Sequence, residues 1–126
     1  MLTRRNPDSV HAPRGYSHSV EAPAGAAWVY ISGQVGIRPD GSLVEDARGQ
    51  IDQVWVNLGA QLEAAGLSRE NIVKVNVFLT RREDIGYYRE SRGAFLGDNP
   101  PASTLLFVSG LADPAMVVEI EAMCVK

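Results

Sequence analysis

The sequence has a single cysteine, Cys124, and only two histidines, both within its first eighteen residues. One cysteine excludes an internal disulfide, and a lone cysteine in an apolar segment is typical of a small buried hydrophobic residue. His11 and His18 lie seven residues apart without a cysteine or an acidic cluster beside them, which is not the spacing of a zinc site. We therefore predict that the protein holds no metal.

Long apolar runs and an excess of basic residues are also missing. No window approaches the ~20 apolar residues that a membrane-spanning helix needs, and the N-terminal residues lack the apolar stretch of a signal peptide. Twelve Lys and Arg against fifteen Asp and Glu give a net charge of −3, so nothing draws the protein toward nucleic acid or anionic lipid. We expect a cytoplasmic protein that acts on small molecules, with no nucleic-acid or membrane partner.

The twelve glycines never fall in the spacing of a dinucleotide-binding fingerprint or of a P-loop, so we expect no cofactor. The length of 126 residues and an apolar content of 45% fit one globular domain, which we place at residues 1–126. Residues 1–15 are rich in Pro, Arg, Asn and Asp and show no periodicity. They are predicted to form an extended N-terminal arm.

Two strand-forming segments follow the arm, at residues 16–20 and 28–32. Between them, residues 21–25 contain the proline and glycine of a turn. The next segment changes period, because apolar residues recur every three or four positions between Ala47 and Ala65. That spacing predicts a helix, with Asp46 as its N-cap and Gly66 as its left-handed stop.

The remaining segments predict a second helix and three more strands. The helix runs from Ile85 to Leu96, and the strands lie at 72–79, 103–108 and 116–124. In the first of these strands, valines alternate with Lys74 and Asn76. The order ββαβαββ predicts an α+β fold of two layers, with both helices on one face of the sheet. The other face is partly apolar and needs a second subunit to cover it.

Four passages, spread over residues 13–125, resemble the RidA (YjgF) family of reactive-intermediate deaminases. They are R-G-Y-S at 14–17, Y-I-S-G-Q-V at 30–35, the helix-to-strand passage at 62–79, and the pair P-A-S-T (101–104) and V-E-I-E-A (118–122). The family forms of the last two are P-A-R-S-T and V-E-I-E-A. The resemblance implies a chorismate-mutase-like fold with a mixed sheet. It also implies a homotrimer with ligand pockets between neighbouring subunits.

Active RidA proteins hydrolyse enamines and imines to a 2-oxo acid and ammonia without a cofactor, so a 2-imino or 2-oxo acid is the implied ligand. The arginine of P-A-R binds the substrate carboxylate, and here Ser103 takes its place. A short neutral hydroxyl cannot form a two-pronged ion pair. With no histidine or acid positioned to activate it, Ser103 is better suited to a pocket wall than to catalysis.

Four further residues match family site positions. Glu119 matches the strand glutamate that holds water, and we favour it as the catalytic base over an ordinary strand carboxylate, whereas Glu121 is the weaker candidate. Tyr16 matches the pocket tyrosine, while Ser32 and Gly33 match the strand end beside the pocket. For these three, a plain turn or core role is equally compatible with the sequence.

Arg89 and Arg92 are candidates to replace the missing arginine, because residues three apart share one face of a helix. The alternative, a solvated helix face shared with Glu90, is the one that the sequence favours. At this level three functions stay open: an imine or enamine hydrolase with an atypical site, a non-catalytic trimer that binds a small metabolite, and, more distantly, an RNA-acting protein.

Overall fold

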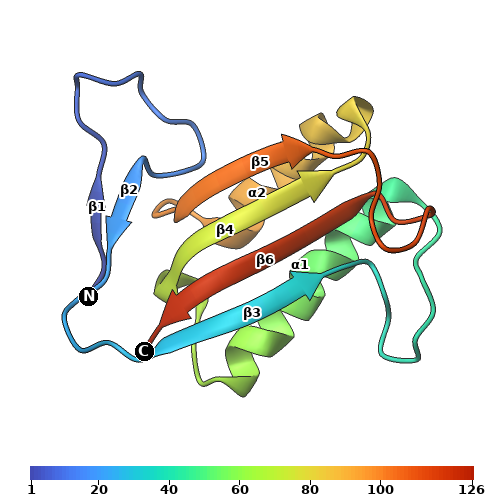
Figure 1. Cartoon of the computed structure of the whole chain (residues 1–126), viewed down its shortest axis with the longest axis horizontal. Helices are drawn as coiled ribbons and strands as arrows, with labels where there is room; N and C mark the ends of the chain where they lie inside the picture. Colours follow the sequence, from blue (N-terminus) through green and yellow to red (C-terminus); the bar gives the residue numbers. More distant parts are fainter.

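The computed structural model describes all 126 residues as a four-stranded sheet with two helices on one face and a separate two-stranded hairpin beyond its end (Figure 1). The helices are α1 (Ala47–Ala64) and α2 (Ile85–Leu96), and short 3-10 turns, η1 (Arg69–Asn71) and η2 (Arg82–Asp84), precede β4 and α2. The strands are β1 (Thr3–Arg5), β2 (Ser19–Glu21), β3 (Trp28–Gln34), β4 (Ile72–Leu79), β5 (Ala102–Phe107) and β6 (Val118–Val125).

The main sheet has the strand order β3-β6-β4-β5. β4 and β5 are parallel, and the other two pairs are antiparallel, so the sheet is mixed. Both helices lie behind this sheet in Figure 1. The predicted α+β fold with two helices on one face is therefore confirmed.

Local signals place α1 where the sequence predicted it. The Asp46 side chain accepts a hydrogen bond from the Gly49 amide, which satisfies one of the free donors at the helix start. Gly66 adopts a φ of 71°, the left-handed conformation that ends many helices. Within α1, Gln50 is buried and exchanges two hydrogen bonds with the backbone of Ala115 and Val117. These bonds fix the start of β6 against the helix.

The core lies between the helices and the sheet. In β4, Val75 and Val77 are buried on the helix side, whereas Lys74 and Asn76 face the opposite, open side. Cys124 belongs to this core, and burial raises the pKa of its thiol to about 11. The prediction of a small buried hydrophobic residue is confirmed.

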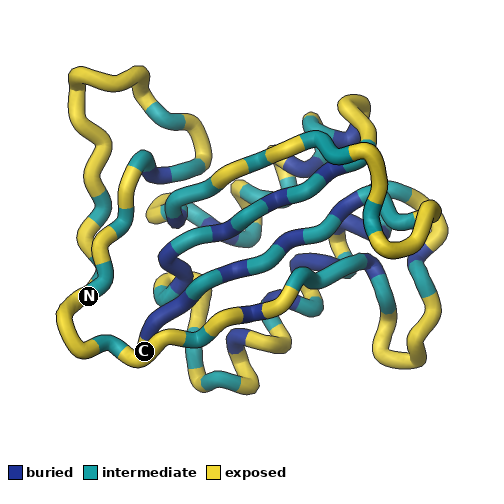
Figure 2. Tube along the Cα trace, viewed as in Figure 1, coloured by how far each residue is buried: buried dark blue, intermediate teal, exposed yellow.

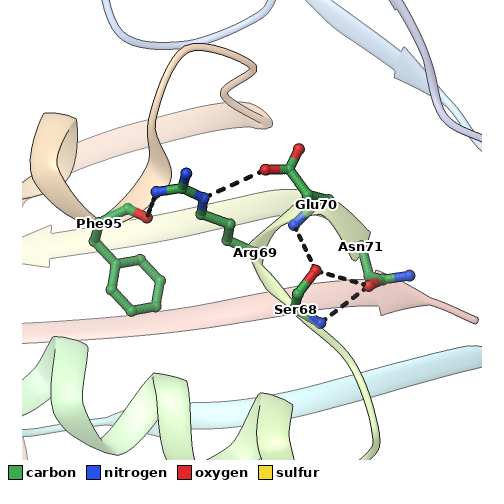
Figure 3. A network of polar contacts seen from close by, with 5 residues as sticks. All are labelled: Ser68, Arg69, Glu70, Asn71 and Phe95. Carbon is green, nitrogen blue, oxygen red and sulfur yellow. Dashed lines mark hydrogen bonds and ion pairs between the residues drawn. The ribbon is translucent and has the colours of Figure 1, made fainter.

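A polar network around η1 joins the segment between α1 and β4 to the end of α2 (Figure 3). Ser68 caps this turn: its Oγ accepts a hydrogen bond from the Glu70 amide at 3.3 Å, and Asn71 Oδ1 accepts one from the Ser68 amide at 3.0 Å. Arg69 donates from Nη1 to the Phe95 carbonyl at 3.2 Å, and the Phe95 ring stacks on Trp55 with 4.7 Å between centroids. The C-terminal end of α2 is thereby tied to the segment that enters β4.

The N-terminal region departs from the prediction. Residues 1–15 are not a featureless arm, because Thr3–Arg5 form β1, and the strand predicted at 16–20 is β2 at Ser19–Glu21. The two pair antiparallel with each other, with Arg4 opposite Val20, and neither joins the main sheet. Figure 2 shows how exposed this hairpin is beside the buried β4 and β6. A periodic pattern is invisible in strands of three residues, so the sequence carried no signal for β1.

Candidate functional site

A cleft of about 770 Å³ lies between the loop that joins β1 to β2, helix α2 and the edge strand β5. Four predicted site residues meet in it: Tyr16, Arg89, Arg92 and Ser103. We call it the arginine cleft. Its complete lining is His11, Ala12, Arg14, Tyr16, Ile85, Arg89, Arg92, Ser103 and Leu105.

Secondary structure explains why these side chains converge. Arg89 and Arg92 are three residues apart in α2 and point to the same side, as the spacing predicted. Ser103 lies opposite the buried Val75 in the β4–β5 pair, so its side chain is on the helix-facing side of the sheet. Tyr16 precedes Ser17, whose hydroxyl donates to the Pro100 carbonyl at 2.6 Å and whose amide donates to Pro101.

The cleft is cationic without a matching acid. It contains the guanidinium groups of Arg14, Arg89 and Arg92, and none of the four ion pairs in the structure involves them. Arg89 is exposed, while Arg92 is half-buried, with its Cζ 5.7 Å from the centroid of the Tyr88 ring. Three unpaired guanidiniums around one cavity favour an anionic ligand, since each is a fork suited to a carboxylate.

Gly15 gives Arg92 its position. Its φ of 75° is in the left-handed region, and a Cβ at this position would clash with the Arg92 guanidinium. The loop therefore passes directly over that guanidinium, which donates from Nη2 to the Arg14 carbonyl at 3.3 Å. The glycine of the R-G-Y-S passage thus brings the loop onto α2 and closes the cleft.

Behind the cleft lies the fully buried Tyr88. Its hydroxyl has no hydrogen-bond partner, and burial raises its pKa to about 12, an effect that the nearby Arg92 and Ser103 oppose. An unsatisfied buried hydroxyl is costly and is uncommon in folded proteins. The Tyr88 hydroxyl therefore lies unsatisfied beneath the cleft, next to Arg92 and Ser103.

Sequence reasoning did not identify three of these residues: His11, Arg14 and Tyr88. His11 Nε2 and the Tyr16 hydroxyl are hydrogen-bonded at 2.8 Å, and His18 Nε2 donates to the His11 carbonyl at 2.7 Å. These contacts depend on how the loop folds back, which no local pattern reveals. For His11 and Arg14, the one available signal was that they lie beside or within the R-G-Y-S passage.

The other predicted residues form a second group on the open face of the sheet. Glu119 lies in β6 opposite Phe78 of β4. Its carboxylate lies against Gly33, where a Cβ would clash with it. β3 has an irregular register between Ile31 and Gln34, so Ser32 and Gly33 fall within a bulge. We call Ser32, Gly33 and Glu119 the Glu119 group.

Hydrogen bonding separates the two strand glutamates. Glu119 and Glu121 share the open face, as predicted, with Ile120 buried between them on the other side. Glu121 accepts a hydrogen bond from Asn76 Nδ2 at 2.9 Å, whereas no hydrogen bond or ion pair involves Glu119. Only Glu119 therefore has a carboxylate free to act on a ligand.

The arginine cleft and the Glu119 group do not meet within one chain. Ser103 faces the helices from β5, while Glu119 faces the opposite side from β6, with β4 between the two strands. The structure thus divides the predicted site residues into four in the cleft and three on the sheet.

No three His, Cys, Asp or Glu side chains gather as a metal site would require, and no helix is long and apolar enough to cross a membrane.

Comparison with known proteins gives this arrangement a context. The sequence profile of the endoribonuclease L-PSP family matches residues 7–126. The chain belongs to this family, the RidA (YjgF) family. Relatives include a RutC family protein of Pyrococcus horikoshii, 34% identical over 88% of this chain and 86% of that protein. Another is the 2-iminobutanoate/2-iminopropanoate deaminase of Mus musculus, 36% identical over 78% of this chain and 73% of that protein.

A crystal structure from the same family resembles the whole chain. It is the Rid-family protein YyfB of Yersinia pestis, 30% identical, which covers 99% of this chain and 98% of its own with a TM-score of 0.92. Residues 1–21 are one-sixth of the 126 residues. Because a TM-score averages over every residue, this value is compatible only with a hairpin similarly placed in both structures.

Proposed function

We propose that this protein hydrolyses imines or enamines of small 2-amino-acid origin, and that Arg89 and Arg92 hold the substrate carboxylate in place of the arginine missing at Ser103. One observation carries the proposal: the unpaired guanidiniums of α2 open into the same cleft as Ser103 and Tyr16. The charge lost from β5 is therefore supplied by a different wall of the same cavity.

The size and chemistry of the cleft suit such a substrate. Its volume of about 770 Å³ exceeds what a four-carbon acid fills and lies within the usual range for small-molecule sites. Ile85 and Leu105 offer an apolar wall for an alkyl group, while the arginines take the carboxylate. Ser103, shorter than an arginine, leaves room in the cleft for a substrate larger than 2-iminobutanoate.

The reaction needs a water molecule and a base. Water adds to the imine carbon, the nitrogen takes up protons, and the carbinolamine collapses to a 2-oxo acid and ammonia. Glu119 is the free carboxylate suited to take a proton from that water and to return one to the departing nitrogen. Since Glu119 lies on the far face of its own sheet, we assign this role to the Glu119 of a neighbouring copy in a homotrimer.

Ammonia release from freshly generated 2-iminobutanoate tests the reaction, and binding of the product 2-oxobutanoate tests the arginine anchor. In the Arg89→Ala and Arg92→Ala variants, we expect 2-oxobutanoate binding to weaken by roughly ten- to a hundredfold, since a charge-assisted hydrogen bond contributes about 1.5–3 kcal/mol. Arg48→Ala is the matched control, because Arg48 is exposed on α1 over the Tyr87 ring and outside the cleft. Unchanged binding in both α2 variants would refute the anchor.

A second function is favoured by Ser103 itself. A trimer that binds a small acid without turnover needs the arginine cleft but not the Glu119 group. Specific 2-oxo acid binding that depends on Arg89 and Arg92, together with ammonia release no faster than in buffer, would establish this binding function instead.

A further inference from the structure

The strands β2 and β3 are neighbours in the sequence, yet they do not pair. Residues 22–27 between them contain Pro23 and Gly25, the composition of a hairpin turn. β2 nevertheless pairs only with β1, and β3 is the outermost strand of the main sheet, with one edge free. Each strand thus presents an unused row of backbone donors and acceptors.

Both free edges are costly to leave uncovered. An isolated two-stranded hairpin is marginally stable in water, and an open edge strand invites another strand to pair with it. On β3, Trp28 and Tyr30 are 48% and 73% exposed, and their rings stack with 6.2 Å between centroids. A pair of large exposed aromatic rings beside an open edge is typical of a surface that a further strand covers.

We propose that β2 of one copy pairs with the free edge of β3 in a second copy, so that neighbouring chains are linked by their N-terminal hairpins. The occupant of the β3 edge is thus a second copy of this chain. The pairing itself does not depend on the proposed function, whereas its consequence for the site does.

The anchoring of the hairpin excludes the same pairing within one chain. Ser17 is bridged to Ala102 at the start of β5 and bonded to Pro100 and Pro101. Arg4 donates from Nε to the same Pro100 carbonyl at 3.2 Å. β5 and β3 are the opposite edges of the sheet, three strand spacings or about 14 Å apart. A hairpin held at β5 therefore reaches only the β3 of another copy.

Such contacts are head-to-tail, because the β5 end of one copy is joined through its hairpin to the β3 edge of the next. Head-to-tail contacts close into a ring when the rotation between copies permits it. The similarly placed hairpin of the Yersinia pestis crystal structure indicates that this conformation is stable in a relative. A closed ring of three would leave no β3 edge exposed.

The register of this pairing completes the proposed site. If residues 22–27 formed a simple hairpin turn, Glu21 would lie opposite Trp28 and Ser19 opposite Tyr30. We assign the same register to the pairing of β2 in one copy with β3 in the next. Two residues further, Ser17 falls opposite the Ser32 of the neighbour, and Tyr16 falls beside its Gly33. The Glu119 carboxylate lies against Gly33, so the exchange delivers the neighbour's Glu119 to the arginine cleft.

Cysteines at a predicted cross-strand pair test the exchange. The full-length Ser19→Cys/Tyr30→Cys variant is oxidised and run on a denaturing gel without reductant. Exchange predicts covalently linked dimers and trimers that collapse to monomers when reduced. A disulfide within single chains would mean that β2 closes onto its own β3, and thiols that stay free would mean that the strands do not pair. Either result overturns the proposal.

Two controls sharpen this test. Thr3→Cys/Tyr30→Cys places the first thiol on β1, opposite Glu21 and one strand further from the neighbour, and it should stay unlinked. Linking there would show that β1, not β2, meets β3. Chains carrying only Ser19→Cys or only Tyr30→Cys, refolded as a mixture, should give covalent dimers but no trimers. Because these readouts need no substrate, they stand or fall separately from the deaminase proposal.

Discussion

The arginine cleft and the Glu119 group carry complementary halves of one chemistry on opposite faces of the sheet. The cleft has three guanidiniums and no acid, whereas the open face has a glutamate without a hydrogen bond or an ion pair. Under the proposed function, each half taken alone is an incomplete site: the cleft would bind the anionic substrate, and Glu119 would act as the base. A single chain would then be organised for binding, and turnover would require a second copy.

The largest effect is expected from removing the base. Glu119→Gln should lower the rate of ammonia release by roughly 10²–10⁴-fold, the usual contribution of a general acid or base. Binding of 2-oxobutanoate should change little, because the arginines that hold it lie in the cleft. Steady-state kinetics and calorimetric titration measure the two quantities.

Glu121→Gln is the matched control for this substitution, since Glu121 lies on the same face of β6 but is bonded to Asn76. A Glu119→Gln variant as active as Glu121→Gln would remove the catalytic half of the comparison and leave a binding protein.

Tyr88, behind the arginine cleft, makes the free energy of unfolding depend on pH in alkali. Its folded pKa of about 12 is raised by burial above the ordinary value of 10.0. Protonation of Tyr88 therefore stabilises the fold fully below pH 10, and this stabilisation is lost as the pH rises toward 12. The loss is about 1.4 kcal/mol for each pH unit in that window.

Urea denaturation from pH 8 to 12 measures this loss. The Tyr88→Phe variant should lose the fall in the free energy of unfolding that Tyr88 causes above pH 10. It should keep the fall due to Cys124, whose raised pKa lowers the free energy of unfolding from about pH 9 to 11. At neutral pH the same variant should be no less stable, because it removes a hydroxyl without a partner. Identical alkaline curves for both proteins would contradict the burial argument.

The smallest effect is expected from Gly15→Ala, and comparison with Gly25→Ala distinguishes a change in the cleft from backbone strain. Gly15→Ala and Gly25→Ala both place a Cβ at a positive φ, which costs roughly 1–2 kcal/mol in the free energy of unfolding. Only at Gly15 does the new Cβ meet Arg92, since nothing lies within 4 Å at Gly25. We expect both variants to lose stability, but only Gly15→Ala to bind 2-oxobutanoate more weakly, by several-fold. Equal binding in the two would mean that the loop does not position Arg92.

Much of the body of the fold could be predicted from local patterns. α1, α2 and β4 have long amphipathic or alternating sequences with clear start and stop residues, and the structure places them where those patterns indicated. The shared face of Arg89 and Arg92 followed from helix geometry in the same way. These predictions needed only residues that are close together in the chain.

The hairpin and the cleft were not predictable in this manner. β1 has three residues, too few for a period to be read. A strand was predicted next to β2, but the position of the hairpin depends on Ser17 and Arg4 contacting Pro100 from far away in the sequence. The roles of His11 and Arg14 in the cleft follow from that long-range contact. No pattern within the first fifteen residues signals it.

The sequence by itself determined the helices, the alternation of β4 and β6, and the absence of an arginine at Ser103, because each depends on residue identity and short-range spacing. Only the tertiary structure decided that Ser103 and Glu119 lie on opposite faces, since strand pairing sets the face each side chain takes. It also decided that the hairpin rests on β5 instead of β3. That placement depends on hydrogen bonds between segments more than eighty residues apart in the sequence, whose geometry no local spacing encodes.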